Sequence, residues 1–155
     1  MSERSAGILL FRMREGKLEV MLVHPGGPFW AKKDAGAWSI PKGLYGEDED
    51  PVVAAKREFK EETGAEVEGN LIELGELRQP RKKIVKVWAV ERDFDEKNIV
   101  SNTFKLEWPK NSGKVREYPE IDKAGWFAVD EAKKKILKGQ LGFIDRLLEI
   151  TKYPS

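Results

Sequence analysis

The most constraining feature of this chain is a group of three glutamates in one short run of helix-forming residues. Glu58, Glu61 and Glu62 lie three and four positions apart in the run Arg57-Glu58-Phe59-Lys60-Glu61-Glu62. In an α-helix this spacing puts the three carboxylates on one face. Like charges so placed destabilise an isolated helix, whereas oxygen ligands gathered on a rigid element suit Mg²⁺. The pattern therefore predicts a helix whose acidic face binds a divalent cation.

Capping signals define where this helix begins and ends. Asp50 is a good N-cap, and Pro51 suits the first helical position, where a missing N–H costs nothing. Gly64 is placed to end the helix in the left-handed conformation. An apolar stripe beside the acidic face consists of Val52, Ala55 and Phe59. We expect this stripe to pack inward while the carboxylates face a cleft.

The stretch from Gly43 to Ala65 carries a fixed pattern of glycine and charged residues. Glu49 follows Gly43 after five residues, and Arg57-Glu58 follows after seven more. This pattern resembles the signature of the Nudix hydrolases. Every charged and glycine position of that signature is present, namely Gly43, Glu49, Arg57, Glu58, Glu61, Glu62 and Gly64. Asp48, where many members have glycine, and Ala65, where a large aliphatic residue is usual, depart from it without removing a metal ligand.

The resemblance implies a fold, an activity and a cofactor. Nudix proteins are α/β/α sandwiches, and Nudix enzymes hydrolyse nucleoside diphosphates linked to another group, by attack of water at phosphorus. The expected cofactor is Mg²⁺, with Mn²⁺ as the alternative. Carried over to this sequence, the metal ligands are Glu58, Glu61, Glu62 and the backbone carbonyl of Gly43. Arg57 would orient the acidic cluster, with Glu49 as its ion-pair partner.

The general base has two candidates, because members of the family differ in which glutamate serves. Glu58 is the first candidate. Glu120 is the second, since it lies just before the last expected strand, where some members place a further glutamate facing the metal ions. The alternative is that Glu120 is an acidic residue of a surface loop without a catalytic role. The expected catalytic residues are therefore Glu58, Glu62, Arg57 and Glu120.

Residues outside the motif predict the substrate contacts. Lys42 lies in Trp-Ser-Ile-Pro-Lys-Gly, which is similar to a stretch in hydrolases of dinucleoside polyphosphates, and is placed to neutralise a phosphate. Trp30, beside Phe29 in a loop with glycine and proline, is placed to stack on a nucleobase. The alternative is that these aromatics plug the loop against the core.

Basic residues cluster around one expected strand junction: Arg78, Arg81, Lys82, Lys83 and Lys86. Among them Arg78 and Lys83 are the expected phosphate contacts, since such side chains bind phosphate oxygens well. The alternative is a solvated strand end.

Composition excludes several other kinds of catalytic site. The 155 residues include no cysteine and one histidine, His24, so Cys-ligated zinc, a thiolate nucleophile and a multi-histidine metal site are excluded. We expect His24 to be structural. Lys and Arg number 28 and Asp and Glu number 27, and the net charge of +1 gives no general case for nucleic acid or membrane binding. Without a signal peptide or a membrane-spanning run, the expected location is the cytoplasm.

The order of apolar segments predicts a single domain over residues 1–155, of the α/β class, with a mixed sheet between helices. Strands are expected over 6–13, 18–23, 38–40, 71–77, 84–90, 104–108 and 124–128. A polar loop is expected over 109–119, a helix from Asp130 to Lys138 ending at Gly139, and a final amphipathic helix carrying Leu141, Ile144, Leu147 and Leu148. Core positions are expected for Trp88, Trp108, Trp126 and Phe127.

The sequence thus predicts a Mg²⁺-dependent pyrophosphohydrolase acting on a small-molecule nucleotide, with no membrane partner and no assigned oligomeric state. The substrate is a nucleoside triphosphate, a dinucleoside polyphosphate or a nucleotide sugar, and the Pro-Lys-Gly context favours polyphosphates. One alternative is a non-catalytic Nudix-like module that binds a nucleotide as a sensor. Another is hydrolysis of RNA 5′ ends, against which the near-neutral charge argues. An isoprenyl diphosphate isomerase is disfavoured, since that branch uses a cysteine.

Overall fold

The computed structural model describes residues 3–153. Its strands are β1 (Glu3–Arg14), β2 (Lys17–Pro25), β3 (Lys42–Leu44), β4 (Ile72–Gln79), β5 (Lys83–Glu91), β6 (Thr103–Glu107), β7 (Val115–Pro119) and β8 (Ile121–Ala128). Its helices are α1 (Pro51–Thr63), α2 (Val129–Lys135) and α3 (Leu141–Thr151), with short 3₁₀ turns at Glu96–Asn98 and Lys138–Gln140. One sheet of six strands has the order β4-β5-β1-β2-β8, with β3 paired to β1, while β6 and β7 form a separate hairpin.

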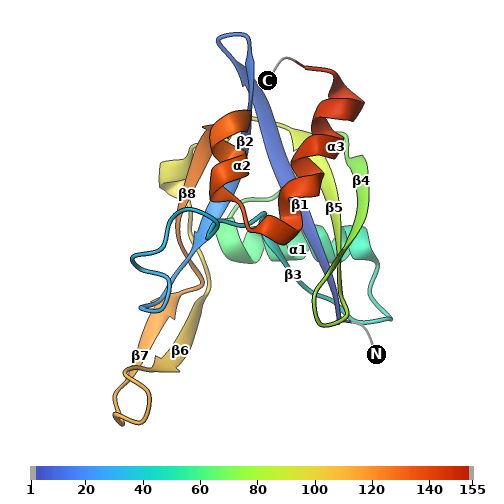
Figure 1. Cartoon of the computed structure of the whole chain (residues 1–155). Coiled ribbons are helices and arrows are strands. Elements are labelled where there is room, and N and C mark those ends of the chain that lie inside the picture. Colours follow the sequence, from blue (N-terminus) through green and yellow to red (C-terminus); the bar gives the residue numbers. More distant parts are fainter. Residues whose placement is uncertain (1–2, 154–155) are drawn as a thin grey trace.

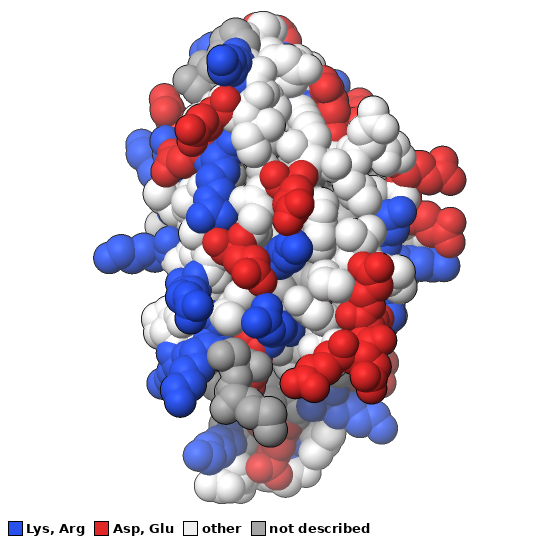
Figure 2. All heavy atoms as spheres, turned by 90° about the vertical axis from the view of Figure 1, so that its right-hand side faces the viewer, with Lys and Arg blue, Asp and Glu red and all other residues white. Residues whose placement is uncertain are grey.

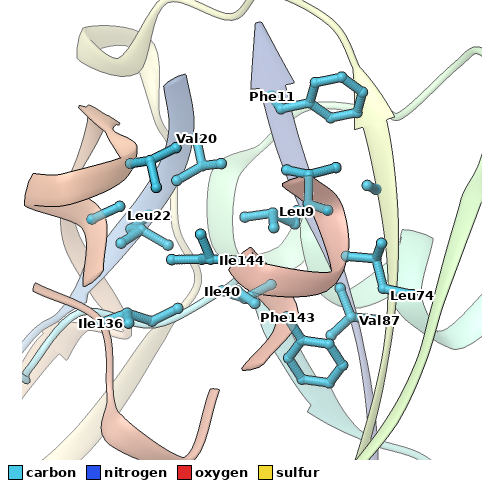
Figure 3. Packing of buried hydrophobic residues seen from close by; sticks show 14 of the residues in the cluster. Leu9, Phe11, Val20, Leu22, Ile40, Leu74, Val87, Ile136, Phe143 and Ile144 are labelled. Carbon is cyan, nitrogen blue, oxygen red and sulfur yellow. The ribbon is translucent and has the colours of Figure 1, made fainter. Parts of the chain in front are cut away.

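Helices cover both faces of the six-stranded sheet, which gives the expected α/β/α sandwich (Figure 1). The sheet is mixed, because β1 runs parallel to β5 and antiparallel to β2 and β3. Alternate side chains of β1 point to opposite faces. Leu9 and Phe11 belong to the cluster that α2 and α3 cover, as Figure 3 shows, whereas Ile8 and Leu10 pack with α1. The apolar side of α1 is therefore fixed to the sheet, and its acidic side is left for other contacts.

The boundaries of α1 follow from its capping residues, as the sequence predicted. The Asp50 carboxylate accepts a hydrogen bond from the backbone N–H of Val52 at 2.9 Å, and Pro51 is the first helical residue. Gly64 has φ = 83° and ends the helix in the left-handed conformation. Phe59 is fully buried against the sheet. These local interactions fix which way the acidic face of α1 points.

The short strand expected over 38–40 is wrong in position. Trp38 and Ser39 make only isolated bridges, to Ile136 and Val23, and the regular strand β3 begins at Lys42. The backbone N–H of Ile40 donates to the side-chain oxygen of Gln140 at 2.9 Å, so it is not available to a neighbouring strand. Pairing with β1 begins at Pro41, which has no N–H to donate but whose carbonyl accepts from the N–H of Ile8 at 3.1 Å.

The polar loop expected over 109–119 is wrong in part, because residues 115–119 form β7. This strand pairs with β6 from Thr103 opposite Pro119 to Glu107 opposite Val115. The hairpin projects from the body of the molecule (Figure 1), so β7 needs few apolar residues and lacks the alternating pattern that indicated β6. Trp108 lies past the end of β6 and is 40% exposed, which contradicts its expected core position. Trp88 is buried as expected, and Trp126 and Phe127 are half-buried.

The helix expected from Asp130 to Lys138 is shorter than predicted. It begins at Val129 after an N-cap, Ala128, that makes no side-chain hydrogen bond, and it ends at Lys135 rather than near Gly139. Ile136 leaves the helix because it pairs with Trp38 and is buried in the core. The final amphipathic helix is confirmed as α3. No helix within residues 3–153 has both the length and the apolar character needed to cross a membrane.

Candidate active site

The acidic face of α1 lies directly against β3. Gly43 pairs with Ala6 of β1, which brings it under Glu58 of the helix. A Cβ atom on Gly43 would lie 1.8 Å from the Glu58 carboxylate oxygen Oε1, a distance that no side chain could tolerate. Residue 43 must therefore be glycine for Glu58 to lie where it does.

Replacement of Gly43 by alanine is expected to lower kcat by about a hundredfold, because the added methyl group displaces Glu58 and even small misplacement of catalytic groups is costly. Gly46→Ala is the matched control, since a Cβ on Gly46 meets no atom within 4 Å. Steady-state kinetics on both variants gives the comparison. Equal loss in both, or a normal kcat for Gly43→Ala, would show that the close contact has no role in turnover.

Arg57 organises the glutamates around it. Its Nε and Nη2 atoms donate to the two oxygens of Glu49 at 3.0 and 2.8 Å, which is the ion pair expected from the sequence. Its Nη1 atom donates to Glu58 at 2.6 Å and lies 3.7 Å from Glu61. Fork-shaped contacts of this kind fix orientation as well as charge. Arg57 thus holds Glu58 and anchors the helix to the loop before it.

The glutamates on the acidic face of α1 lie close to one another and to Glu120. Burial raises the pKa of Glu62 to about 8, and the charges of Glu120 and Glu58 add to the shift, while Lys42 opposes it. Burial also raises the pKa of Glu58, with a further contribution from Glu61. The pKa of Glu120 is raised for the same two reasons, burial and the charge of Glu61. Four glutamates from two distant segments therefore share one electrostatic environment.

Glu120 reaches this environment because of its backbone contacts. It lies between β7 and β8, where its N–H donates to the carbonyl of Asn102 at 2.7 Å. Its own carbonyl accepts from the N–H of Gly26 at 2.8 Å. The structure therefore places Glu120 with the glutamates of α1, as the second candidate for general base requires.

The chemistry of this donor set fits a hard divalent cation. All four acidic groups offer oxygen ligands, and three of them have raised pKa values because they are partly buried and lie near the charges of other glutamates. Across residues 3–153, no three acidic or histidine side chains are placed closely enough to hold an ion in their present rotamers. Glu58, for instance, is turned toward Arg57.

A cavity of about 450 Å³ opens beside Glu62 and Glu120, and we call it the aromatic cavity. Phe29 and Trp30 line it from the loop after β2. The ring of Phe29 is 53% exposed and meets Trp30 edge to face at 5.1 Å. Trp30, expected to stack on a base, thus lies at the site rather than plugging the core. Two further lining residues, Phe104 and Leu106 of β6, were not anticipated as binding residues.

A second cavity of about 340 Å³ borders Lys42, and we call it the basic cavity. Lys42, Arg81 and Lys83 line it, together with Gln140. Lys42 interacts with the charges of both Glu62 and Lys83, and burial lowers its pKa. Of the two expected phosphate contacts in the basic cluster, Lys83 therefore lies near Lys42, whereas Arg78 is exposed and lines neither cavity. Lys86 is paired with Glu73 at 3.2 Å.

His24 is a structural residue, as expected. It is completely buried at the end of β2. Its Nδ1 atom lies 2.9 Å from Asp122 and its Nε2 atom lies 2.6 Å from the carbonyl of Lys33. These contacts join the loop that carries Trp30 to the start of β8, close to Glu120.

The raised pKa of Glu62 predicts how the stability of the metal-free protein depends on pH. Between about 4.5, the ordinary value, and about 8, the native state keeps a proton that the unfolded chain has lost. The free energy of unfolding should therefore fall by about 4 kcal/mol as pH rises through this window. Melting curves in chelator from pH 5 to pH 8 would measure it. In Glu62→Gln this decrease should largely disappear, whereas a control substitution of exposed Glu66 by glutamine should keep it.

Comparisons with known proteins agree with this architecture. A family model described as the NUDIX domain matches residues 1–147. The Ap4A hydrolase of C. elegans, solved as a binary complex, is similar with a TM-score of 0.63 at 21% identity, over 97% of this chain and 98% of that chain. The NUDIX domain of Shewanella oneidensis NrtR, complexed with ADP ribose, is similar with a TM-score of 0.66 at 17% identity, over 97% of this chain and 89% of that chain. At such identities the likeness shows the fold. No curated protein matches this chain in sequence.

Proposed function

This chain belongs to the Nudix hydrolase family, and we propose that it is a Mg²⁺-dependent pyrophosphohydrolase of nucleotides that carry a polyphosphate chain. One observation carries the proposal. Of the four electrostatically coupled glutamates, Glu62 and Glu120 line the aromatic cavity, and Glu62 interacts with Lys42, which lines the basic cavity. The site therefore has an aromatic part and a basic part, with Glu62 linked to both. A nucleotide has the same division, with a flat uncharged base at one end and phosphates at the other. The linkage to be cleaved would lie over the glutamates.

Each residue at the centre has a distinct role in this proposal. Glu58, Glu61, Glu62 and the carbonyl of Gly43 would hold the metal, which when bound neutralises phosphoryl oxygens and lowers the pKa of water. Arg57 holds Glu58 in place, since it contacts Glu58 at 2.6 Å and is itself fixed by Glu49. The proton of the attacking water passes to Glu58 or Glu120, whose raised pKa values suit a general base near neutral pH.

The basic cavity favours a polyphosphate substrate over a nucleotide sugar. The charge of Lys42 interacts with those of Glu62 and Lys83. Phosphates that extend beyond Glu62 would therefore meet the basic side chains of the basic cavity, Lys42, Arg81 and Lys83. A nucleotide sugar carries an uncharged sugar beyond its diphosphate, whereas a longer phosphate chain would bring negative charge to the basic cavity as well. Nucleoside triphosphates and dinucleoside polyphosphates carry such a chain, and an Ap4A hydrolase is among the proteins with a similar fold.

A panel of nucleotides tests the proposal directly. Nucleoside triphosphates, dinucleoside polyphosphates and nucleotide sugars would each be incubated with the protein and Mg²⁺, and the products identified by mass. We expect cleavage at a P–O–P bridge, faster for the first two classes than for nucleotide sugars. Absence of turnover across the panel, with either Mg²⁺ or Mn²⁺, would overturn the proposal in favour of a nucleotide-binding module. Preference for nucleotide sugars would overturn the assignment of the basic cavity.

Replacement of Trp30 by alanine is expected to raise KM for nucleotides by about tenfold, because stacking of a base on an aromatic side chain is worth roughly 1–3 kcal/mol. Its effect on kcat should be small, since the proposed role of Trp30 is to stack on the base and not to bind the metal or the cleaved linkage. Trp108→Ala is the matched control: it removes a tryptophan that is exposed and lines neither cavity. An unchanged KM for Trp30→Ala across the panel would return Trp30 to a structural role.

Hydrolysis of RNA 5′ ends is the less favoured activity. A long nucleic acid needs a continuous basic surface that tracks its backbone. On the face in Figure 2, basic and acidic side chains are intermixed, which agrees with the net charge of +1. The basic residues of the basic cavity are enough for a short phosphate chain, and a small nucleotide fits the site better.

A further inference from the structure

The lining of the aromatic cavity suits an uncharged ring better than a phosphate. The charged residues that line it are Glu62 and Glu120, and no lysine or arginine is among the described residues that do so. Lys33 stacks on Phe29, with its Nζ atom 3.8 Å from the ring centroid, but Lys33 does not line the cavity. The lining therefore offers a phosphate no cationic partner. The remaining walls are made mainly of apolar and aromatic side chains, which favour a flat group with low hydration.

Besides the loop aromatics, the β6–β7 hairpin contributes to the lining of the cavity. Phe104 and Leu106 are alternate residues of β6 and therefore share one face of the strand. Phe104 packs beside Tyr118 of β7, with ring centroids 6.1 Å apart. It also reaches Gly27, where an added Cβ would lie 3.1 Å from its ring. The hairpin thus brings an aromatic and an aliphatic side chain to a cavity that Phe29 and Trp30 also line.

Main-chain hydrogen bonds connect this hairpin to the catalytic glutamates. Asn102, just before β6, donates its N–H to the carbonyl of Glu61 at 2.8 Å. Its carbonyl accepts from Glu120, and the Glu120 carbonyl in turn accepts from Gly26. We call this series from Glu61 to Gly26 the main-chain bridge. It fixes both walls of the cavity at a set distance from Glu120 and α1.

Residue 26 must be small for the main-chain bridge to form. A Cβ on Gly26 would lie 2.0 Å from the carbonyl oxygen of Pro119, so any side chain would push the loop away from Glu120. Gly26 and Gly27 thus let the loop approach both Glu120 and Phe104. The close fit of loop, hairpin and helix defines a preformed slot rather than a loose surface.

We propose that Phe104 and Leu106 form one wall of a nucleobase subsite, facing Phe29 and Trp30, and that Phe104 determines the affinity for the base. The proposal deepens the proposed function, on which it rests, by assigning the end of the substrate that carries no phosphate. The base lies between the hairpin and the loop, and its phosphates extend past Glu62 toward Lys42. The main-chain bridge sets the distance between this subsite and the glutamates.

Binding of small probes to the metal-free protein tests the subsite without any turnover. Saturation-transfer NMR would be recorded with AMP and with ribose 5-phosphate, which has the same sugar and phosphate but no base. We expect strong transfer to the base protons of AMP and at least tenfold weaker binding of ribose 5-phosphate. Phe104→Ala should weaken AMP binding about tenfold, as expected for loss of one stacking partner, and should leave ribose 5-phosphate unchanged.

Further variants separate a direct contact from damage to the hairpin. Leu106→Glu leaves the Phe104–Tyr118 pair in place but adds a charge to the slot, and it should weaken AMP binding as well. Val115→Ala is the control, since Val115 lies on the same hairpin, is 60% exposed and lines neither cavity. Wild-type affinity for AMP in both Phe104→Ala and Leu106→Glu would overturn the subsite, as would equal affinities of the wild type for the two probes.

Turnover of the same proteins distinguishes failure of the subsite from failure of the proposed function. Mg²⁺-dependent cleavage of nucleotides with a KM that Phe104→Ala leaves unchanged would overturn the subsite alone. Base-dependent AMP binding that Phe104→Ala removes, in a wild type that cleaves nothing in the panel, would overturn the proposed function alone.

Discussion

Replacement of Glu62 by glutamine is expected to lower kcat by about a thousandfold, or about 4 kcal/mol of transition-state stabilisation. The proposed metal site loses a charged oxygen ligand in this variant, while size and shape are kept. Glu62 also borders the aromatic cavity and interacts with Glu120 and Lys42, so it lies where both proposed parts of the substrate meet. Steady-state kinetics with the best substrate of the panel would measure the change.

The fold should survive this substitution and gain stability in the absence of metal. Burial makes the Glu62 carboxylate costly at pH 8, and glutamine carries no charge. The melting temperature of Glu62→Gln in chelator at pH 8 should therefore equal or exceed that of the wild type. The control is Glu66→Gln, since Glu66 is exposed and pairs only with Lys60 at 3.0 Å on the surface. Near-normal turnover by Glu62→Gln would defeat the assignment of Glu62 as a metal ligand.

Removal of divalent metal is expected to abolish turnover, and Mg²⁺ should restore it. The proposed reaction depends on a cation because the glutamates and the phosphates are all negative, and their repulsion must be neutralised before they can approach. Phosphate or pyrophosphate release would be followed in chelator and then with increasing Mg²⁺ or Mn²⁺. Turnover that persists in chelator would contradict the metal-dependent mechanism.

Metal should also stabilise the protein when no substrate is present. A ligand that binds only the native state stabilises it by an amount that grows with the logarithm of the ligand concentration above Kd, and so raises the melting temperature. We expect this rise to be larger at pH 8 than at pH 6, because the Glu62 carboxyl must lose its proton before it can bind a cation. The rise should be reduced in Glu62→Gln and kept in Glu66→Gln. A rise of equal size in all three proteins would indicate metal binding elsewhere.

The elements governed by local rules could be predicted from the sequence. α1 begins after Asp50 and ends before Gly64 as expected, because capping and the left-handed C-cap depend on neighbouring residues. Its acidic face, the ion pair of Arg57 with Glu49 and the position of Glu120 before the last strand also agree with the pattern. The mixed sheet between helices agrees with the α/β/α fold that the resemblance of residues 43–65 to the Nudix signature implied.

Contacts between distant segments could not be predicted in the same way. The alternation of Phe104 and Leu106 indicated a half-buried strand, but it did not show that the hairpin covers a cavity rather than the core. β7 was missed because a strand that pairs only with β6 needs little apolar surface. β3 was misplaced because Gln140, far along the chain, takes the N–H of Ile40. In each case the deciding partner lies outside the local sequence.

The main-chain bridge has a consequence for how this protein can diverge. The hydrogen bonds that join the hairpin and the loop to Glu61 and Glu120 use backbone atoms alone. Exchange of the hairpin side chains therefore leaves the placement of the glutamates unchanged. Selection or directed evolution can then retune which ligand is accepted at Phe104 and Leu106 while the hydrolytic chemistry stays constant, so these two positions are where a mutational library should be concentrated.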